Sequence, residues 1–189
     1  FLGEMFWLIS ASYFLLNIFY TFWFKHIVLL DVFSIAGGFM LRVVGGAAAI
    51  SVIASPWLII CTLFVSLFLG FAKRRSELVN MNSDGGSLTR KVLDDYDIAF
   101  LDIMLMITAS GMAISYSLYT VSERTIKELN TENLIYSTVF VLYGIFRYLS
   151  LMQIKKMGGE PEEILLKDRP LQIDILLWAI SVMVIFYLF

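Results

Sequence analysis

The sequence predicts an all-α, polytopic transmembrane helical bundle, and three observations support this fold class. Hydrophobic residues make up 59% of the 189 residues and charged residues only 16%, a balance outside the range of soluble globular domains. Residues 5–24, 43–72 and 103–122 contain no charge, and about 20 apolar residues are enough for a helix to cross a bilayer. The charges gather between these runs, as they do in loops between membrane helices.

Six spans follow from the uncharged runs and from the residues that interrupt them. The second span contains two charges, Asp31 near its start and Arg42 near its middle, and Pro56 separates it from the third because proline breaks a helix. The expected spans cover residues 5–24, 30–53, 56–72, 98–121, 134–152 and 173–189.

Net charge, cysteine content and motifs exclude several classes of protein. The formal net charge of -2 excludes a chain that binds nucleic acid mainly through phosphate contacts. Cys61 is the single cysteine, so no disulfide framework is expected. The sequence contains no nucleophile elbow, no glycine-rich dinucleotide loop and no Cys/His spacing typical of a metal site.

Lysine and arginine are distributed unevenly between alternate loops, which predicts the orientation of the chain. One side receives only Arg124 and Lys127. The other side receives ten basic residues: Lys25, Lys73, Arg74, Arg75, Arg90, Lys91, Lys155, Lys156, Lys167 and Arg169. The side with ten is predicted to be cytoplasmic, in a bacterial inner membrane, with both ends of the sequence on the opposite side.

Arg42 is the candidate functional residue of the second span. Helical spacing places Gly38 and Gly45 one turn to either side of it, which leaves a hollow around the guanidinium. Glycines also allow close helix packing, and a buried carboxylate could neutralise the arginine. An arginine about 16 Å into a span is costly unless it faces a polar cavity or a partner, so an anion-binding or cavity-lining role is favoured.

Two basic segments flank the polar region after the third span. Lys73, Arg74 and Arg75 alone are typical of a topology signal, but Arg90 and Lys91 follow a turn that predicts a second short helix. Together the segments predict a basic rim for phosphate groups, which Arg147 is deep enough to join.

Two further segments are rich in acidic residues. The run at residues 94–97, Asp-Asp-Tyr-Asp, resembles a metal-binding cluster but more often marks the negative start of a helix, here the fourth span. Residues 158–170 alternate in charge, which predicts a structured loop with internal ion pairs.

The order of motifs resembles the UbiA prenyltransferase superfamily, and within it the branch of decaprenyl-phosphate phosphoribosyltransferases. The resemblance covers essentially the whole chain. The motifs that carry it are Tyr-Thr-Phe-Trp-Phe-Lys-His at 20–26, the stretch from Asp31 to Gly46 that contains Arg42, Lys-Arg-Arg-Ser-Glu-Leu at 73–78, Gly-Glu-Pro-Glu-Glu at 159–163 and Lys-Asp-Arg-Pro-Leu-Gln at 167–172.

The resemblance implies a longer parent protein. The family has nine membrane helices, and the six spans correspond to its last six, so residues 1–189 are expected to form a single transmembrane domain that lacks an N-terminal third. The first aspartate-rich motif, which binds Mg2+ with the donor diphosphate, would precede Phe1, so the main metal ligands are expected upstream. Bases at 73–75 replace the second aspartate-rich motif, which argues against an ordinary aromatic prenyltransferase.

The resemblance implies a Mg2+-dependent membrane transferase that moves 5-phosphoribosyl from phosphoribosyl diphosphate to a polyprenyl phosphate lipid, as in cell-wall biosynthesis. Its implied catalytic residues are Arg42, Lys73, Glu77 and Asp168. Its implied substrate-binding residues are Tyr20, Lys25, Arg74, Arg90, Lys91, Arg147 and Arg169. Two alternatives stay open, a prenyltransferase with an aromatic acceptor and a membrane transporter or subunit. The chain alone is expected to be inactive, and a homo-oligomer is one expected state.

Overall fold

The structure is a computed structural model that describes residues 3–84, 91–153 and 161–188. The described residues form helices and no strands, which confirms the predicted fold class. Six of the helices are long and apolar enough to cross a membrane. The α-helices are α1 (Glu4–Phe22), α2 (Leu30–Ala49), α3 (Pro56–Asp84), α4 (Ile98–Thr120), α5 (Glu123–Leu129), α6 (Thr138–Gln153), α7 (Pro161–Lys167) and α8 (Arg169–Leu188).

Three short 3-10 helices lie between them: η1 (Phe24–His26), η2 (Lys91–Asp95) and η3 (Asn133–Ser137). The chain divides into two compact units, residues 1–108 and residues 109–189, and the division falls within α4.

Sequence features explain where the elements begin and end. α3 begins at Pro56, at the first helical position where a missing amide hydrogen is no loss, and the amide of Ile59 bonds the carbonyl of Ser55. α3 continues well beyond residue 72, so the polar segment after the third span is helical as far as Asp84. Asp97 precedes α4 and accepts a 3.1 Å hydrogen bond from the amide of Ala99, as a helix N-cap does.

The loops predicted between the spans contain more helix than expected. Between the fourth and fifth spans lies α5, whose N-cap Ser122 accepts a hydrogen bond from the amide of Thr125 and whose C-cap Asn130 is left-handed. Before the last span lies α7, and α8 begins at Arg169, four residues earlier than residue 173. In α5 these capping residues satisfy end groups that a short helix leaves unpaired.

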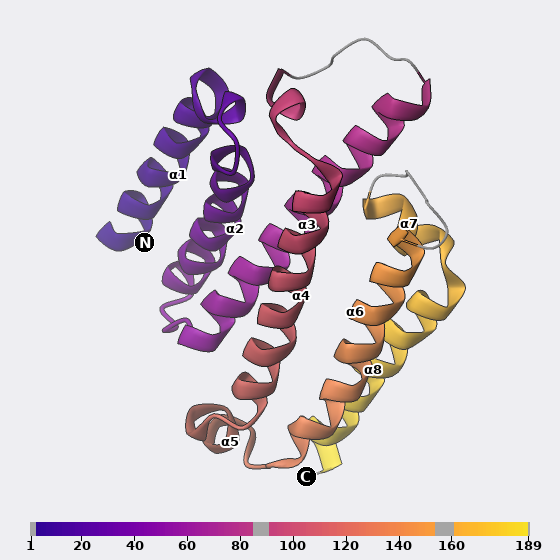
Figure 1. Cartoon of the computed structure of the whole chain (residues 1–189). Helices are drawn as coiled ribbons and strands as arrows, with labels where there is room; N and C mark the ends of the chain where they lie inside the picture. The colour runs from indigo at the N-terminus through magenta and orange to yellow at the C-terminus, as the bar shows by residue number, and fades with distance from the viewer. Residues whose placement is uncertain (1–2, 85–90, 154–160, 189) are drawn as a thin grey trace. The chain divides into compact units, whose positions relative to one another are not determined.

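The first unit is built on α2, which packs against α1 on one side and α3 on the other (Figure 1). Its core contains Val32 and Ala36 of α2 together with Phe71 and Ala72 of α3, all at most 2% exposed. α2 and α3 approach closely at Gly70, where an added Cβ would lie 2.6 Å from Cγ1 of Val32. Hydrocarbon is as apolar as leucine, so small residues and close packing hold membrane helices together.

The second unit is built on α6 and α8, which lie side by side (Figure 1). Its core contains Ile145, Leu151 and Leu171. The hydroxyl of Tyr116 accepts a 2.9 Å hydrogen bond from the indole of Trp178 on α8 and shares a 2.7 Å hydrogen bond with the hydroxyl of Ser137. These bonds tie the end of α4 to η3 and α8.

The close approach at Gly70 leads to a first testable expectation. Gly70→Ala should lower the free energy of unfolding by about 1–3 kcal/mol, because the new methyl group must displace Val32 in a packed contact. Gly46 of α2 is the matched control, since nothing lies within 4 Å of its added Cβ; Gly46→Ala should be neutral or slightly stabilising. Unfolding in mixed detergent micelles measures both, and equal stabilities would contradict the close α2–α3 contact.

Candidate functional site

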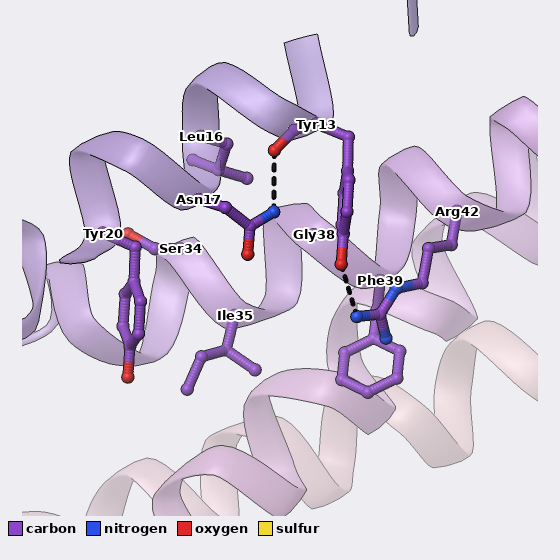
Figure 2. A pocket seen from close by; sticks show the side chains of 9 residues that line it. All are labelled: Tyr13, Leu16, Asn17, Tyr20, Ser34, Ile35, Gly38, Phe39 and Arg42. Atoms are coloured by element: carbon purple, nitrogen blue, oxygen red, sulfur yellow. Dashed lines mark hydrogen bonds between the residues drawn. The ribbon is translucent and has the colours of Figure 1, made fainter. Parts of the chain in front are cut away.

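Arg42 of α2 lies beside a pocket of about 100 Å³ between α1 and α2 (Figure 2). Its Nη2 donates a 2.6 Å hydrogen bond to the hydroxyl of Tyr13 on α1. The guanidinium carbon lies 5.2 Å from the centroid of the Tyr13 ring and 4.9 Å from that of Phe39, within the range of cation–π attraction. The pocket is lined by Tyr13, Leu16, Asn17, Tyr20, Ser34, Ile35, Gly38, Phe39 and Arg42.

Glycines of α2 allow α1 to approach the pocket. An added Cβ at Gly38 would lie 3.6 Å from the Tyr13 ring, and one at Gly45 would lie 3.3 Å from Ile9. The space that the sequence predicted around Arg42 is thus shared between the pocket and the packing of α1. The structure brings together Arg42 and Tyr20, two of the predicted site residues, on the walls of this pocket.

Within the described parts of the chain, Arg42 forms no ion pair with a carboxylate; its contacts are one phenol and two aromatic rings. These contacts leave its positive charge unneutralised. Phenol, amide and hydroxyl groups from Tyr20, Asn17 and Ser34 line the same pocket. A guanidinium beside neutral hydrogen-bonding groups favours an anion such as a phosphate group.

Arg74 of α3 forms the centre of a buried network at the start of α2. Its Nε donates a 2.6 Å hydrogen bond to Asp31 and its Nη1 donates a 2.7 Å hydrogen bond to Glu77. Asp31 is 0% and Arg74 1% exposed. Arg74 is predicted to hold donor phosphates, but its guanidinium is already bound to two carboxylates. A contact between Arg74 and a phosphate stays a prediction.

Tyr96 completes the network from the segment before α4. Its hydroxyl donates a 2.7 Å hydrogen bond to Asp31 and accepts a 2.8 Å hydrogen bond from the amide of Leu29. Leu29 has φ 68, a left-handed conformation that is unfavourable for leucine, so the phenol fixes a strained residue at the N-cap of α2. Burial, followed by the hydrogen bond to Asp31, raises the pKa of Tyr96 above its ordinary value.

The first unit contains the other residues that were predicted to form the basic rim. Arg75 donates a 2.5 Å hydrogen bond to Asp102 of α4. Lys25 lies in η1, and Lys73 lies on α3 immediately before Arg74. Arg90 lies outside the described residues, and Lys91 begins η2, the short helix expected near this position. The basic rim as a phosphate site stays a prediction.

In the second unit, Arg147 of α6 and Asp168 form a bidentate ion pair. Nε lies 3.1 Å from Oδ1 and Nη2 lies 2.8 Å from Oδ2. Oδ1 of Asp168 also accepts a 3.0 Å hydrogen bond from the amide of Leu171, so Asp168 is the N-cap of α8. Arg169, the first residue of α8, is exposed. The pair therefore fixes the start of α8 against α6.

The described carboxylates do not form a magnesium site. No group of three or more His, Cys, Asp or Glu side chains that could hold a metal occurs within the described ranges. Asp31 and Glu77 both bind Arg74, and a guanidinium occupies the positions that a cation would need. The described residues thus do not fit the Mg2+ that the resemblance implies.

Sequence reasoning missed two residues of these clusters, Tyr13 and Tyr96. Tyr13 lies in an uncharged, aromatic-rich run and Tyr96 lies between two aspartates, so nothing in the pattern identifies either phenol as a partner of a buried charge. Asp31 stands out in the sequence as a charge in a span, and the basic residues one helix away are those at 73–75.

Comparison with curated proteins finds relatives of one name, decaprenyl-phosphate phosphoribosyltransferase. The protein from Mycolicibacterium smegmatis is 31% identical over 176 residues, which cover 90% of this chain and 55% of the relative. The protein from Corynebacterium glutamicum is 28% identical over 182 residues, 95% of this chain and 54% of the relative. The protein from Mycobacterium tuberculosis is 26% identical over 175 residues, 93% of this chain and 56% of the relative.

No family model matches the chain. The chain spans about half the length of the curated relatives it matches.

The six long helices and the pocket at Arg42 define a polytopic helical membrane protein with an arginine at a pocket between two spans. Within that class, the chain is a distant homologue of the decaprenyl-phosphate phosphoribosyltransferases of the UbiA superfamily. The resemblance seen in the sequence motifs is confirmed.

The buried pair leads to a second testable expectation. Asp31→Asn should lower the free energy of unfolding by about 3–5 kcal/mol, because it leaves Arg74 buried with only Glu77 as a carboxylate partner. Asp97→Asn is the matched control, since Asp97 is exposed and asparagine also caps helices. Unfolding in mixed micelles measures both, and a small effect at Asp31 would mean that the ion pair is replaceable.

A third expectation concerns Tyr96 and pH. Tyr96→Phe should cost about 1–3 kcal/mol at neutral pH, because the amide of Leu29 and a carboxylate oxygen of Asp31 lose their partner. Because the pKa of Tyr96 is raised, the extra stability of the native protein over the variant is complete below pH of about 10. This extra stability is lost as the pH rises further. Exposed Tyr136, changed to Phe, is the control. A difference between native and variant that grew above pH 10 would contradict the assignment.

Proposed function

We propose that the protein transfers a 5-phosphoribosyl group from phosphoribosyl diphosphate to the phosphate of a polyprenyl lipid, such as decaprenyl phosphate, in a bacterial membrane. The observation that carries the proposal is the extent of the homology, since matches to three relatives of that name cover 90%, 95% and 93% of this chain. Because the chain spans about half of those relatives, the activity is proposed for the protein that contains the full set of helices.

The reaction exchanges one bond at the anomeric carbon of the ribose. The bond between C1 and the diphosphate oxygen breaks, and its electron pair leaves with the diphosphate. An oxygen of the lipid phosphate supplies the electron pair of the new bond to C1. The departing diphosphate and the incoming lipid phosphate are both anions, so fixed positive charge and hydrogen-bond donors are what the protein must supply.

Arg42 is the residue best placed to supply such charge in the first unit. Its guanidinium has no carboxylate partner among the described residues and adjoins a pocket with polar groups from Tyr20, Asn17 and Ser34. The position of Arg42 inside a span suits the phosphate of a lipid, whose tail stays among the helices. We propose that Arg42 and Tyr20 attract the lipid phosphate or the departing diphosphate.

The remaining predicted residues divide into two proposed groups. The donor is a soluble polyanion, so its proposed contacts are basic residues of the loops on one membrane face: Lys25, Lys73, Arg90, Lys91 and Arg169. Glu77 and Asp168 bind Arg74 and Arg147, and we propose that they position these cations. We further propose that this face is cytoplasmic, which the excess of lysine and arginine supports.

An assay with two labelled donors tests the proposal. Membranes that contain the protein are incubated with polyprenyl phosphate and labelled phosphoribosyl diphosphate, and the expected product is a labelled lipid with release of diphosphate. Transfer from a prenyl diphosphate to an aromatic acceptor, without labelled phosphoribosyl lipid, would support the prenyltransferase alternative instead. Solute flux that required Arg42 while no lipid was labelled would support the transporter alternative.

Arg42→Gln provides the fourth expectation. The variant should reduce phosphoribosyl transfer by about 10²–10³-fold, the usual effect of removing one group that stabilises negative charge at the reacting centre. It should fold normally, since Arg42 is exposed and forms no ion pair within the described ranges. Lys127→Gln is the control because Lys127 lies on the exposed surface of α5. Full activity of Arg42→Gln would exclude Arg42 from the site.

A further inference from the structure

A second pocket, of about 440 Å³, lies between α6 and α8 in the second unit. Its size is typical of small-molecule sites. Six of its lining residues are apolar or aromatic and the seventh is an acid: Val139, Phe140, Tyr143, Pro170, Ile173, Leu177 and Asp174. Val139, Ile173 and Leu177 are also exposed on a membrane span, so the pocket opens on an apolar surface of this unit.

Asp174 is the unusual residue of this pocket. It is 7% exposed, and across the described part of the chain it receives no hydrogen bond and no ion pair. Gly144 of α6 makes room for it, because an added Cβ there would lie 3.0 Å from Oδ2 of Asp174. Arg147, one turn further along α6, does not neutralise it because both oxygens of Asp168 bind that guanidinium.

An unmatched carboxylate within a membrane span is costly and is typically functional. Compensation requires a cation or a strong hydrogen-bond donor that reaches the pocket from outside. The aromatic rings of Phe140 and Tyr143 line the same pocket as the carboxylate of Asp174. A carboxylate together with aromatic rings favours binding of an ammonium group. The apolar remainder of the pocket favours an occupant with hydrocarbon chains over a water-soluble amine.

The depth of Asp174 agrees with a phospholipid head group. It is the sixth residue of α8, which begins at Arg169, so it lies about 7 Å along the helix axis from the start of the span. The head-group layer on each side of a bilayer is about 5–7 Å thick. Asp174 therefore lies where an ammonium head group meets the acyl chains.

We propose that the pocket between α6 and α8 binds a phospholipid with a primary ammonium head group, with the ammonium on Asp174 and an acyl chain along Ile173 and Leu177. This site is separate from the pocket at Arg42, and it does not depend on the proposed transfer reaction. The lipid stabilises the α6–α8 pair by neutralising the one acid that the described chain leaves unmatched there.

Native mass spectrometry of the purified full chain tests this site. The protein is exchanged into equal amounts of phosphatidylethanolamine and phosphatidylglycerol with identical acyl chains, and the lipid that remains bound is identified. The native protein should retain phosphatidylethanolamine in preference. Asp174→Asn should reduce that retention about fivefold or more, because it removes the charge that binds the ammonium. Glu132→Gln, an exposed charge loss in the same unit, should change nothing.

A second pair of variants tests the apolar lining of the pocket independently of the charge of Asp174. Leu177→Ala should weaken retention because Leu177 lines the pocket, whereas Leu176→Ala should not, because Leu176 is 60% exposed and does not line it. Equal retention of the two lipids by the native protein, or unchanged retention by Asp174→Asn, would overturn the proposal. A dimer that Asp174→Asn dissociates would also overturn it, by showing that a second copy of the chain occupies the pocket.

Discussion

The ion pair between Asp31 and Arg74 is the interaction on which the first unit depends. In hydrocarbon, apolar helix faces gain little by leaving lipid for one another, so hydrophobic burial alone does not choose one register of α2 against α3. A buried carboxylate and guanidinium have only one low-energy arrangement, and here it also involves Glu77 and the Tyr96 hydroxyl. The pair therefore sets the start of α2 and with it the position of Arg42, three turns further along the helix.

Most of the fold could be predicted because membrane helices are encoded in long uncharged runs. The prediction failed where capping decides the structure. α5, α7 and the extension of α3 to Asp84 are helical, and in α5 the N-cap Ser122 satisfies an amide at the helix start. Hydropathy does not report such bonds, so these segments were expected to be loops.

The sequence predicts the charged residue of the candidate site, Arg42, but not the uncharged residues that surround it. The cost of placing an arginine inside a membrane span identified Arg42 from the sequence alone, and its flanking glycines predicted space beside it. The partner that fills part of this space is Tyr13, 29 residues earlier, and an uncharged aromatic residue in an aromatic-rich span gives no signal. In the same way, the sequence shows that Asp31 needs a cation but not which of three adjacent bases supplies it.

Charge matching also distinguishes structural acids and bases from candidate binding groups in this chain. Asp31, Arg74, Asp168 and Arg147 are matched by one another within their own units, and each pair fixes the start of a helix. Arg42 and Asp174 lie within spans, adjoin pockets and have no oppositely charged partner among the described residues. Since hydrocarbon penalises an uncompensated charge, we propose that bound molecules supply the compensation, an anion at Arg42 and a cation at Asp174. On this proposal the two pockets bind ligands of opposite charge, and one substrate does not account for both.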